Sequence, residues 1–391
     1  MAEQHEKALV PQIRFTGFTD PWEQRKVQDV ADRFDNLRIP VAANLRVHGK
    51  TPYYGANGIQ DYVDGFTHDG EFVLVAEDGA NDLKNYPVKC VNGRIWVNNH
   101  AHVLQGKAGI ADNSFLAFAI SQSDIESLLV GGGRAKLNAE TLMSIEFRLP
   151  CLQEQHQIGE YLTRLDHLIT LHQRKYDKLC VLKKSMLDKM FPKGGSLYPE
   201  IRFAGFTDPW EQRKLGELYQ KNDERNTDGL GSERTLSVAS MTFNSAGNGA
   251  DDSSLPNYKR LRLGDIAFEG HTNKEFAYGR FVLNDAGNGI MSPRFTCLRP
   301  IVEQEYSFWK YFIHSEKVMR PILVNSTKSG TMMNELVVED FLKQEILVPS
   351  LPEQRRIGAF FDRLDSLITL HQRKLELLRN IKKSMLDKMF V

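Results

Sequence analysis

The sequence predicts an α+β protein, with two pseudo-two-fold-related domains separated by an antiparallel pair of long coiled-coil helices. Three observations lead to this prediction. Several segments of the chain occur twice. Each copy ends in a long stretch whose apolar positions alternate in steps of four and three, which is the spacing of a coiled coil. The blocks between the shared segments show short strand patterns with Asn-Gly turns.

The repeat divides the chain into six parts. Residues 13–26 recur at 201–214 with one difference, Thr16 against Ala204, and residues 183–191 recur unchanged at 382–390. Two shared segments are therefore alike while two blocks differ, which favours two equal partners and two unequal targets. Gene duplication followed by drift is the alternative. The first copy has a lead segment (1–27), a variable block (28–148) and a long helix (149–191). The second copy has a linker with the second lead (192–215), a second variable block (216–347) and a second long helix (348–391).

The long helices need a partner, because a rod with an apolar stripe along its whole length is not stable alone in water. We expect them to pair with each other antiparallel, which gives a pseudo-two-fold axis and sets the variable blocks at opposite ends. His172 and His371 would then meet near the axis; the alternative is that each lies at a partly wet seam. Gly159 and Gly358 predict a close backbone approach. The expected seam includes Leu165, Ile169, His172, Leu364, Ile368 and His371.

The variable blocks have the pattern of irregular α+β domains. In the first we expect strands at 71–76 and 93–97, and in the second at 280–283 and 295–298. Each block ends with a short helical stretch, at 139–144 and at 338–343, that leads toward the long helix.

No catalytic motif stands out. The sequence has no G-x-x-x-x-G-K-[ST] phosphate loop, no G-x-S-x-G elbow and no H-E-x-x-H pair. His100-Ala-His102 resembles a metal-ligand pair, but core or surface histidines are the favoured interpretation because no third ligand is nearby in sequence. Asp69 with Asp82-Leu-Lys84 fits only a permissive nuclease pattern. We therefore expect a non-catalytic chain without a metal or cofactor of its own.

The four cysteines, Cys90, Cys151, Cys180 and Cys297, stand far apart. Their spacing fits neither a zinc cage nor a disulfide framework, and it favours a reducing cytoplasm. No apolar run approaches the roughly 18 residues of a membrane span, and the start of the chain lacks a secretory-signal pattern.

Together, these features resemble the specificity (S) subunit of type I restriction–modification enzymes. The resemblance covers residues 13–390. It rests on the doubled layout, on Pro52-Tyr-Tyr-Gly-Ala-Asn-Gly58, and on the doubled entries into the long helices, Leu149-Pro-Cys-Leu-Gln-Glu-Gln155 and Val348-Pro-Ser-Leu-Pro-Glu-Gln354.

The resemblance implies a DNA-binding subunit without catalysis. Each variable block would be a target recognition domain for one half of a split double-stranded DNA site. The shared segments would dock two methyltransferase (M) subunits, and motor-nuclease (R) subunits would join them. AdoMet would then belong to the M partner, and ATP with Mg to the R partner. A coiled-coil scaffold for protein or glycan ligands, and a self-sufficient nuclease, are the rival functions.

Candidate DNA contacts are side chains near loops whose donors suit a DNA groove or phosphate. Solvated surface charge is the alternative for each. We expect subunit docking at two identical Trp/Arg pairs, since both residue types favour interface anchors; ordinary packing at the helix ends is the alternative. The DNA candidates are Lys50, Arg94, Arg134, Lys136, Lys259, Arg260, His271, Asn273, Lys274 and Lys328, and the docking candidates are Trp22, Arg25, Trp210 and Arg213.

The charge balance runs against a self-sufficient DNA-binding protein. Block 28–148 has 11 Lys and Arg against 15 Asp and Glu, and block 216–347 has 15 against 18. Because phosphate neutralisation supplies most non-specific DNA affinity, we expect the M subunits to provide much of the phosphate contact. Local clusters of cations that face the duplex are the alternative.

Overall fold

The computed structural model describes residues 10–131, 135–244, 251–331 and 333–390. Contacts divide the chain into two compact units, residues 1–173 with 373–391 and residues 174–372. Each unit therefore contains part of both long helices, α4 (Leu152–Lys189) and α9 (Leu351–Met389). Among the described residues, no helix is long and apolar enough to cross a membrane.

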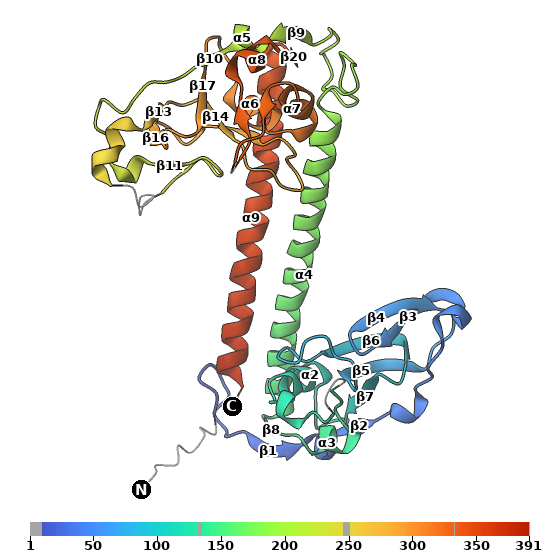
Figure 1. The fold of residues 1–391 in the computed structure, drawn as a ribbon. Coiled ribbons are helices and arrows are strands. Elements are labelled where there is room, and N and C mark those ends of the chain that lie inside the picture. The colour runs from blue at the N-terminus through green and yellow to red at the C-terminus, as the bar shows by residue number, and fades with distance from the viewer. Residues whose placement is uncertain (1–9, 132–134, 245–250, 332, 391) are drawn as a thin grey trace. The chain divides into compact units, whose positions relative to one another are not determined.

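Unit 1 is built on a six-stranded sheet with the order β2-β7-β5-β6-β3-β4, and its strands are antiparallel except for β3 and β6 (Figure 1). A separate pair, β1 with β8, joins the shared lead to the strand before α4. The elements are β1 (Glu23–Lys26), α1 (Val27–Val30), β2 (Ala31–Arg33), β3 (His48–Gly55), β4 (Gly58–Val63), β5 (His68–Ala76), β6 (Val88–Val97), β7 (Ala101–Gly106), α2 (Asn113–Ser121), α3 (Ala139–Ser144) and β8 (Glu146–Leu149), with short 3-10 turns η1 (Asp35–Leu37), η2 (Ala43–Leu45) and η3 (Glu126–Leu128).

Unit 2 has the same outer frame around a different interior. β9 pairs with β20 as β1 pairs with β8, but the main sheet has four strands in the order β10-β17-β14-β15. The elements are β9 (Glu211–Lys214), α5 (Leu215–Leu218), β10 (Tyr219–Lys221), η4 (Ser232–Arg234), β11 (Leu236–Ser237), β12 (Thr242–Phe243), η5 (Asp252–Asn257), β13 (Lys259–Leu261), β14 (Ile266–Glu269), β15 (Arg280–Leu283), β16 (Gly289–Met291), β17 (Thr296–Pro300), α6 (Tyr306–Phe312), α7 (Glu316–Leu323), β18 (Thr327–Lys328), β19 (Glu335–Leu336), α8 (Val338–Lys343) and β20 (Glu345–Val348).

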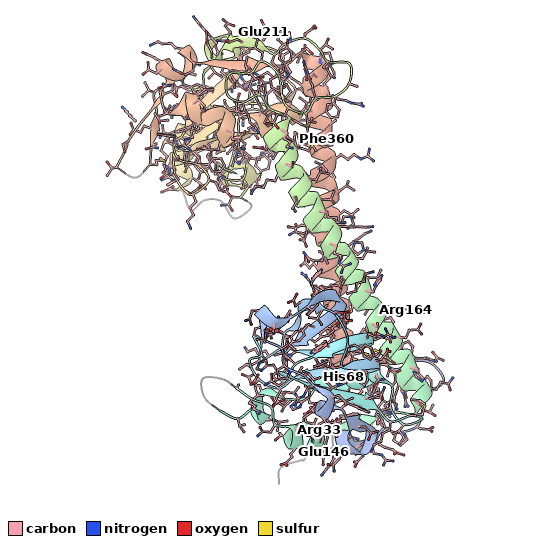
Figure 2. All side chains as sticks on the ribbon, turned by 90° about the vertical axis from the view of Figure 1, so that its right-hand side faces the viewer. Arg33, His68, Glu146, Arg164, Glu211 and Phe360 are labelled. Atoms are coloured by element: carbon pink, nitrogen blue, oxygen red, sulfur yellow. The ribbon has the colours of Figure 1, made fainter. Side chains whose placement is uncertain are left out.

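Within each unit the two long helices run antiparallel. In unit 1, Lys382 contacts Asp166 and Arg379 contacts Gln173. The residue numbers on α9 therefore decrease as those on α4 increase, which is antiparallel pairing. In unit 2, Phe191 packs near Phe361 while Lys183 pairs with Asp365, which is the same direction of pairing. Outward residues such as Arg164, 73% exposed, point away from the seam (Figure 2). The predicted fold class is confirmed.

The close approach predicted at the two helix glycines is also present. A Cβ on Gly159 would lie 2.9 Å from the backbone N of Phe115 on α2, and one on Gly358 would lie 2.7 Å from the backbone N of Phe308 on α6. Both distances are shorter than side chains tolerate. Glycine therefore lets α2 rest directly on α4 and α6 rest directly on α9.

In each unit, the C-terminal end of the long helix from the other repeat completes the hydrophobic core. In unit 1, Phe390 at the end of α9 stacks on Phe115, with 5.4 Å between ring centroids, and meets Trp22 edge-on. In unit 2, Phe191 at the end of α4 lies 5.2 Å from Phe312. The identical ends of the two helices thus fill equivalent positions, each in the unit of the other repeat.

Candidate nucleic-acid interface

In unit 1, two of the predicted DNA contacts lie on the sheet surface. Lys50 is exposed on β3. Arg94 on β6 is 66% exposed; it pairs with Asp69 at 3.2 Å and lies over the ring of Phe66. Because both members of the Arg94–Asp69 pair face solvent, the pair contributes little to stability. The guanidinium can therefore exchange this partner for a phosphate or a base edge at small cost.

Of the two remaining candidates of the first block, the structure describes Lys136. Lys136 is 44% exposed, and its Nζ lies 2.9 Å from Glu77. Arg134 falls outside the described residues. Lys136 is held by backbone hydrogen bonds with Val130 in both directions, so its ammonium group projects from a fixed backbone.

In unit 2, three candidates share the loop between β14 and β15. His271, Asn273 and Lys274 are all exposed. The Asn273 side chain accepts hydrogen bonds from the backbone N–H groups of Glu275 and Phe276, which gives the loop a defined turn. Lys328 on β18 is 66% exposed and pairs with Glu335 at 3.4 Å. These four residues remain predicted DNA contacts.

The prediction for Lys259 and Arg260 is wrong, because both residues are 7% exposed. Lys259 Nζ donates to the carbonyl of Phe295 and pairs with Asp223 at 3.3 Å. Arg260 pairs with Asp228 at 2.8 Å. A charge is buried in a protein only with such partners, and burial removes both cations from any DNA surface.

The two tryptophans proposed for docking lie inside the chain's own cores. Trp22 is 3% exposed and Trp210 is 1% exposed, so neither ring can anchor a partner. Both rings instead pack at the ends of the long helices, which was the alternative interpretation. Arg25 and Arg213 keep side chains that are 49% and 30% exposed, paired with Glu23 and Glu217 respectively. The two arginines stay predicted docking residues.

The expected seam residues point inward to different degrees. Leu165 and Leu364 are buried, at 7% and 4% exposed, whereas Ile169, Ile368 and the two histidines are partly buried. His172 belongs to unit 1 and His371 to unit 2, so their meeting near an axis stays a prediction.

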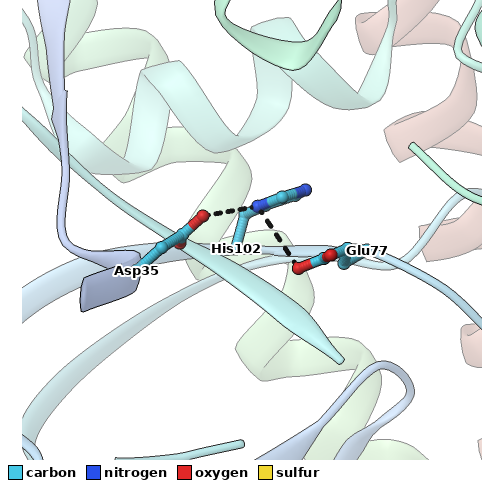
Figure 3. Close-up of side chains that lie close together, drawn as sticks. All are labelled: Asp35, Glu77 and His102. Atoms are coloured by element: carbon cyan, nitrogen blue, oxygen red, sulfur yellow. Dashed lines mark hydrogen bonds and ion pairs between the residues drawn. The ribbon is translucent and has the colours of Figure 1, made fainter. Parts of the chain in front are cut away.

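One cluster in unit 1 contains residue types that bind metals. His102 Nδ1 lies 2.7 Å from Asp35 and 3.7 Å from Glu77 (Figure 3). However, Arg38 donates to Glu77 at 2.6 Å, and Lys136 approaches Glu77 from the other side. Burial raises the pKa of each carboxyl group, but the pKa of both is lowered on balance. At Asp35 the hydrogen bonds from His102 and from the backbone N–H of Val103 outweigh burial, and at Glu77 those from Arg38 and Lys136 do so. The carboxylates are already neutralised, which disfavours a metal here.

The permissive nuclease pattern does not form a site either. Asp82 accepts hydrogen bonds from the backbone N–H groups of Lys84 and Asn85 and from the Asn85 side chain. Asp69 pairs with Arg94 instead. Asp82 therefore shapes a turn rather than joining Asp69 around a metal.

The sequence interpretation missed a buried ion pair at the start of each long helix. Arg14 binds both oxygens of Glu154, at 2.7 and 2.8 Å, and Arg202 binds both oxygens of Glu353 at 2.7 Å. The two glutamates are almost fully buried. Arg and Glu occur at the same places in both copies of the repeat. This repetition was a signal for the pair, because a buried charge is stable only with its partner. These pairs fix the shared leads to the helices.

A family model described as the type I restriction modification DNA specificity domain matches the chain twice, over residues 19–180 and 207–380. A putative type I restriction enzyme specificity subunit of Haemophilus influenzae is 44% identical over 146 residues, which are 37% of this chain and 38% of that one. Longer matches are a type I specificity subunit of Methanocaldococcus jannaschii, 24% identical over 94% of this chain and 92% of that one, and a putative one of Mycoplasma pneumoniae, 22% identical over 87% and 88%.

The same architecture is known from a solved structure. The crystal structure of a type I restriction–modification S subunit from M. genitalium superposes with a TM-score of 0.67 and 16% sequence identity, over 98% of this chain and 99% of that one. The likeness is one of fold, and it covers both units together with both long helices.

Proposed function

Because the chain belongs to the family of type I restriction–modification specificity subunits, we propose that it reads a bipartite, asymmetric DNA site and docks two methyltransferase subunits, which the motor-nuclease subunits join. The chain itself is non-catalytic. AdoMet belongs to the methyltransferase partner, and ATP with Mg to the motor-nuclease partner. The complex works in the cytoplasm, where the host DNA lies.

One observation carries this proposal: the two units share their frame and differ in their interiors. The strands β1 and β9 have the same sequence, Glu-Gln-Arg-Lys, and they pair with β8 and β20 in the same register. The main sheets differ, with six strands in unit 1 and four in unit 2. Identical frames suit two copies of one enzyme, whereas different sheets suit two different half-sites.

The charges of the two blocks support phosphate contacts that are made mainly by the partner. Both blocks are net acidic, and the exposed arginine Arg94 and lysine Lys328 each pair with a carboxylate. The isolated chain should therefore bind DNA weakly and gain affinity with the methyltransferase bound, because counterion release scales with the number of phosphates neutralised.

A block exchange tests the proposal. The chain is expressed with its methyltransferase in a host, and methylated sites are mapped by sequencing with and without the gene. Replacing residues 28–148 by the equivalent block of a relative should change one half of the methylated motif and leave the other half intact. The matched control, an exchange of residues 216–347, should change only the other half.

Two outcomes would contradict the proposal. One is a methylation pattern that does not depend on the gene. The other is a single block exchange that changes both halves of the motif at once, since the blocks would then not act as separate readers.

A further inference from the structure

A glutamine in the first turn of each long helix is buried and hydrogen-bonded. Gln155 of α4 is 1% exposed, and Gln354 of α9 is 4% exposed. Both belong to the doubled entries into the long helices. A side-chain amide offers an acceptor oxygen and two N–H donors, so one glutamine can join backbone groups of several segments. Because the amide is buried, loss of these bonds would leave polar groups without partners, which is unfavourable.

In unit 1, Gln155 joins the entry of α4 to the loop between β7 and α2. Its Oε1 accepts from the backbone N–H of Asp112, the N-cap residue of α2, at 2.9 Å. Its Nε2 donates to the carbonyl of Ile110 at 3.0 Å and to that of Pro150 at 2.9 Å. Asp112 and Ile110 lie in the variable block, whereas Pro150 lies in the shared entry. The glutamine therefore links the shared helix directly to the variable block.

The start of α2 is in turn fastened to the main sheet of unit 1. The side-chain oxygen of Asn113, the first residue of α2, accepts from the backbone N–H of Gly106 on β7 at 2.7 Å. Phe115 and Leu116 of α2 share a buried core cluster with Val73 of β5. The position of the sheet on α4 is therefore set where Gln155 holds the start of α2.

Unit 2 uses the equivalent glutamine for the same connection. Gln354 Nε2 donates to the carbonyl of Pro349 at 2.9 Å. Its Oε1 accepts from the backbone N–H of Glu305, the N-cap residue of α6, at 3.3 Å and from the indole N–H of Trp309 at 3.0 Å. The Trp309 ring meets Tyr219 of β10 edge-on, with 5.6 Å between ring centroids. The same side chain thus joins the second long helix to a different sheet.

Apolar contacts between α2 and α4 leave more freedom than these hydrogen bonds do. Ile158 and Leu162 of α4 lie in the same buried cluster as Phe115 of α2. Hydrophobic burial is non-directional, whereas a hydrogen bond weakens steeply when its angle becomes unfavourable. Apolar burial therefore keeps the domain in contact with the helix, and the glutamine is the group suited to fix its orientation.

We infer that Gln155 and Gln354 are positioning residues that set the number of base pairs between the two half-sites. Each long helix continues from one unit into the other, so the orientation of a domain on its helix decides where that domain meets the DNA. The inference rests on the proposed function and adds to it a determinant of the spacer length.

The geometry of DNA makes the spacer a sensitive measure of this orientation. One added base pair moves a half-site by about 3.4 Å along the duplex and turns it by about 35°. A domain that is held by its glutamine cannot follow this change. A domain without that link can follow it, and it still reads the same bases.

The experiment uses the full chain in complex with its methyltransferase. The duplexes keep both half-sites and differ in the number of base pairs between them. Wild type should methylate one spacer length. Gln155→Met keeps the length of the side chain but lacks the amide donors and acceptor. Methylation of spacers one base pair longer or shorter, relative to the wild-type spacer, should rise about tenfold. The bases required in each half-site should not change, and Gln354→Met should relax the spacer in the same way.

Two further variants separate positioning from loss of stability. Gly159→Ala pushes α2 away from α4 through a different contact, so it should relax the spacer as Gln155→Met does. Val103→Ala is the matched control, because Val103 on β7 is 0% exposed in a second core cluster that, among the described residues, includes none from α4. This control weakens unit 1 without altering its link to α4, so methylation should fall by the same factor at every spacer.

Two results would overturn the inference. One is an unchanged spacer profile in both Gln155→Met and Gln354→Met. The other is a profile for Val103→Ala that broadens as much as that of Gln155→Met. If wild type methylates no duplex in a way that depends on the two half-sites, the proposed function fails instead.

Discussion

Lys382 on α9 contacts Asp166 on α4 in unit 1, with Nζ 2.6 Å from Oδ1. The repeat-equivalent residues form the reciprocal pair in unit 2, where Lys183 on α4 lies 2.5 Å from Asp365 on α9. Each lysine occupies an apolar seam position of the coiled-coil pattern. A polar residue at such a position typically sets the register of the helices, so these pairs fix how far one helix is displaced along the other.

Replacing Lys382 by methionine should therefore change register more than stability. Both side chains of the Lys382–Asp166 pair are partly exposed, and such pairs contribute about 0.2–1 kcal/mol. We expect a loss of less than about 1 kcal/mol in the free energy of unfolding, measured by denaturant titration. A double-mutant cycle with Asp166→Asn should give a coupling of the same size. A coupling near zero would mean that the pair contributes nothing to the stability of the helix pair.

A fragment of residues 1–195 should dimerise. Unit 1 in the full chain is completed by Phe390 against Trp22 and Phe115, and the fragment lacks that residue but carries its equivalent, Phe191. Two fragments can each supply Phe191 to the other. Sedimentation should show a dimer, and with methyltransferase the dimer should read a palindrome of the first half-site.

The control for the fragment is Phe191→Ala, which should weaken its dimer. In the full chain, removal of a buried phenylalanine side chain typically costs about 3–5 kcal/mol. A wild-type fragment that is monomeric, or that reads an asymmetric site, would contradict the exchanged arrangement of helix ends.

Gly159→Ala should destabilise the chain although alanine favours helices by about 1 kcal/mol. The new Cβ would lie 2.7 Å from Asp112 Oδ1 and 2.9 Å from Phe115 N, so α2 must move away from α4. The thermal unfolding midpoint should fall. Gln157→Ala, at an exposed position of the same helix turn, is the control and should leave the midpoint unchanged or raise it; equal midpoints for both variants would disprove the close contact.

Acid should weaken unit 2 through Glu224. Hydrogen bonds from Arg262 and Arg299 outweigh partial burial and lower the pKa of Glu224 to about 2. A carboxyl group with a depressed pKa stabilises the fold above its ordinary value of 4.5, and this contribution is lost as pH falls toward about 2. Unfolding midpoints measured across this window should fall less steeply for Glu224→Gln than for wild type. Glu335→Gln, at an exposed pair in the same unit, should follow the wild-type slope.

Arg25→Glu should remove one of the two proposed methyltransferases. The arginine side chain is half exposed on β1 and pairs only weakly with an exposed Glu23, so reversal of its charge acts on a partner rather than on the fold. Native mass measurement should show one methyltransferase instead of two. Lys84→Glu, an exposed charge reversal in the variable block, should retain both; two methyltransferases on Arg25→Glu would exclude this arginine from docking.

Elements with a local periodic pattern were predictable from the sequence. The short helices expected at 139–144 and 338–343 have those bounds in the structure. The long helices, Leu152–Lys189 and Leu351–Met389, lie inside the expected parts 149–191 and 348–391 and begin three residues later than those parts do. Helix and strand periods are properties of neighbouring residues, so a single sequence carries them.

Burial of individual charged and aromatic residues was not predictable in this way. Lys259 and Arg260 have the sequence context of a basic surface strand, but Asp223 and Asp228, more than thirty residues earlier, accompany them into the interior. Trp22 and Trp210 sit in polar segments, yet their rings pack on residues from distant helices. The partners that decide burial lie far away along the chain.

The sequence by itself determined the doubled layout, the two long helices, their heptad seam and the lack of a catalytic motif, because repeats and periods can be read locally. Only the tertiary structure decided which helix end completes which core, which cations stay at the surface, and that Gln155 and Gln354 bond to the segments that begin α2 and α6. Those outcomes depend on contacts between residues widely separated in sequence, and the free energy of each contact exists only once the chain has folded.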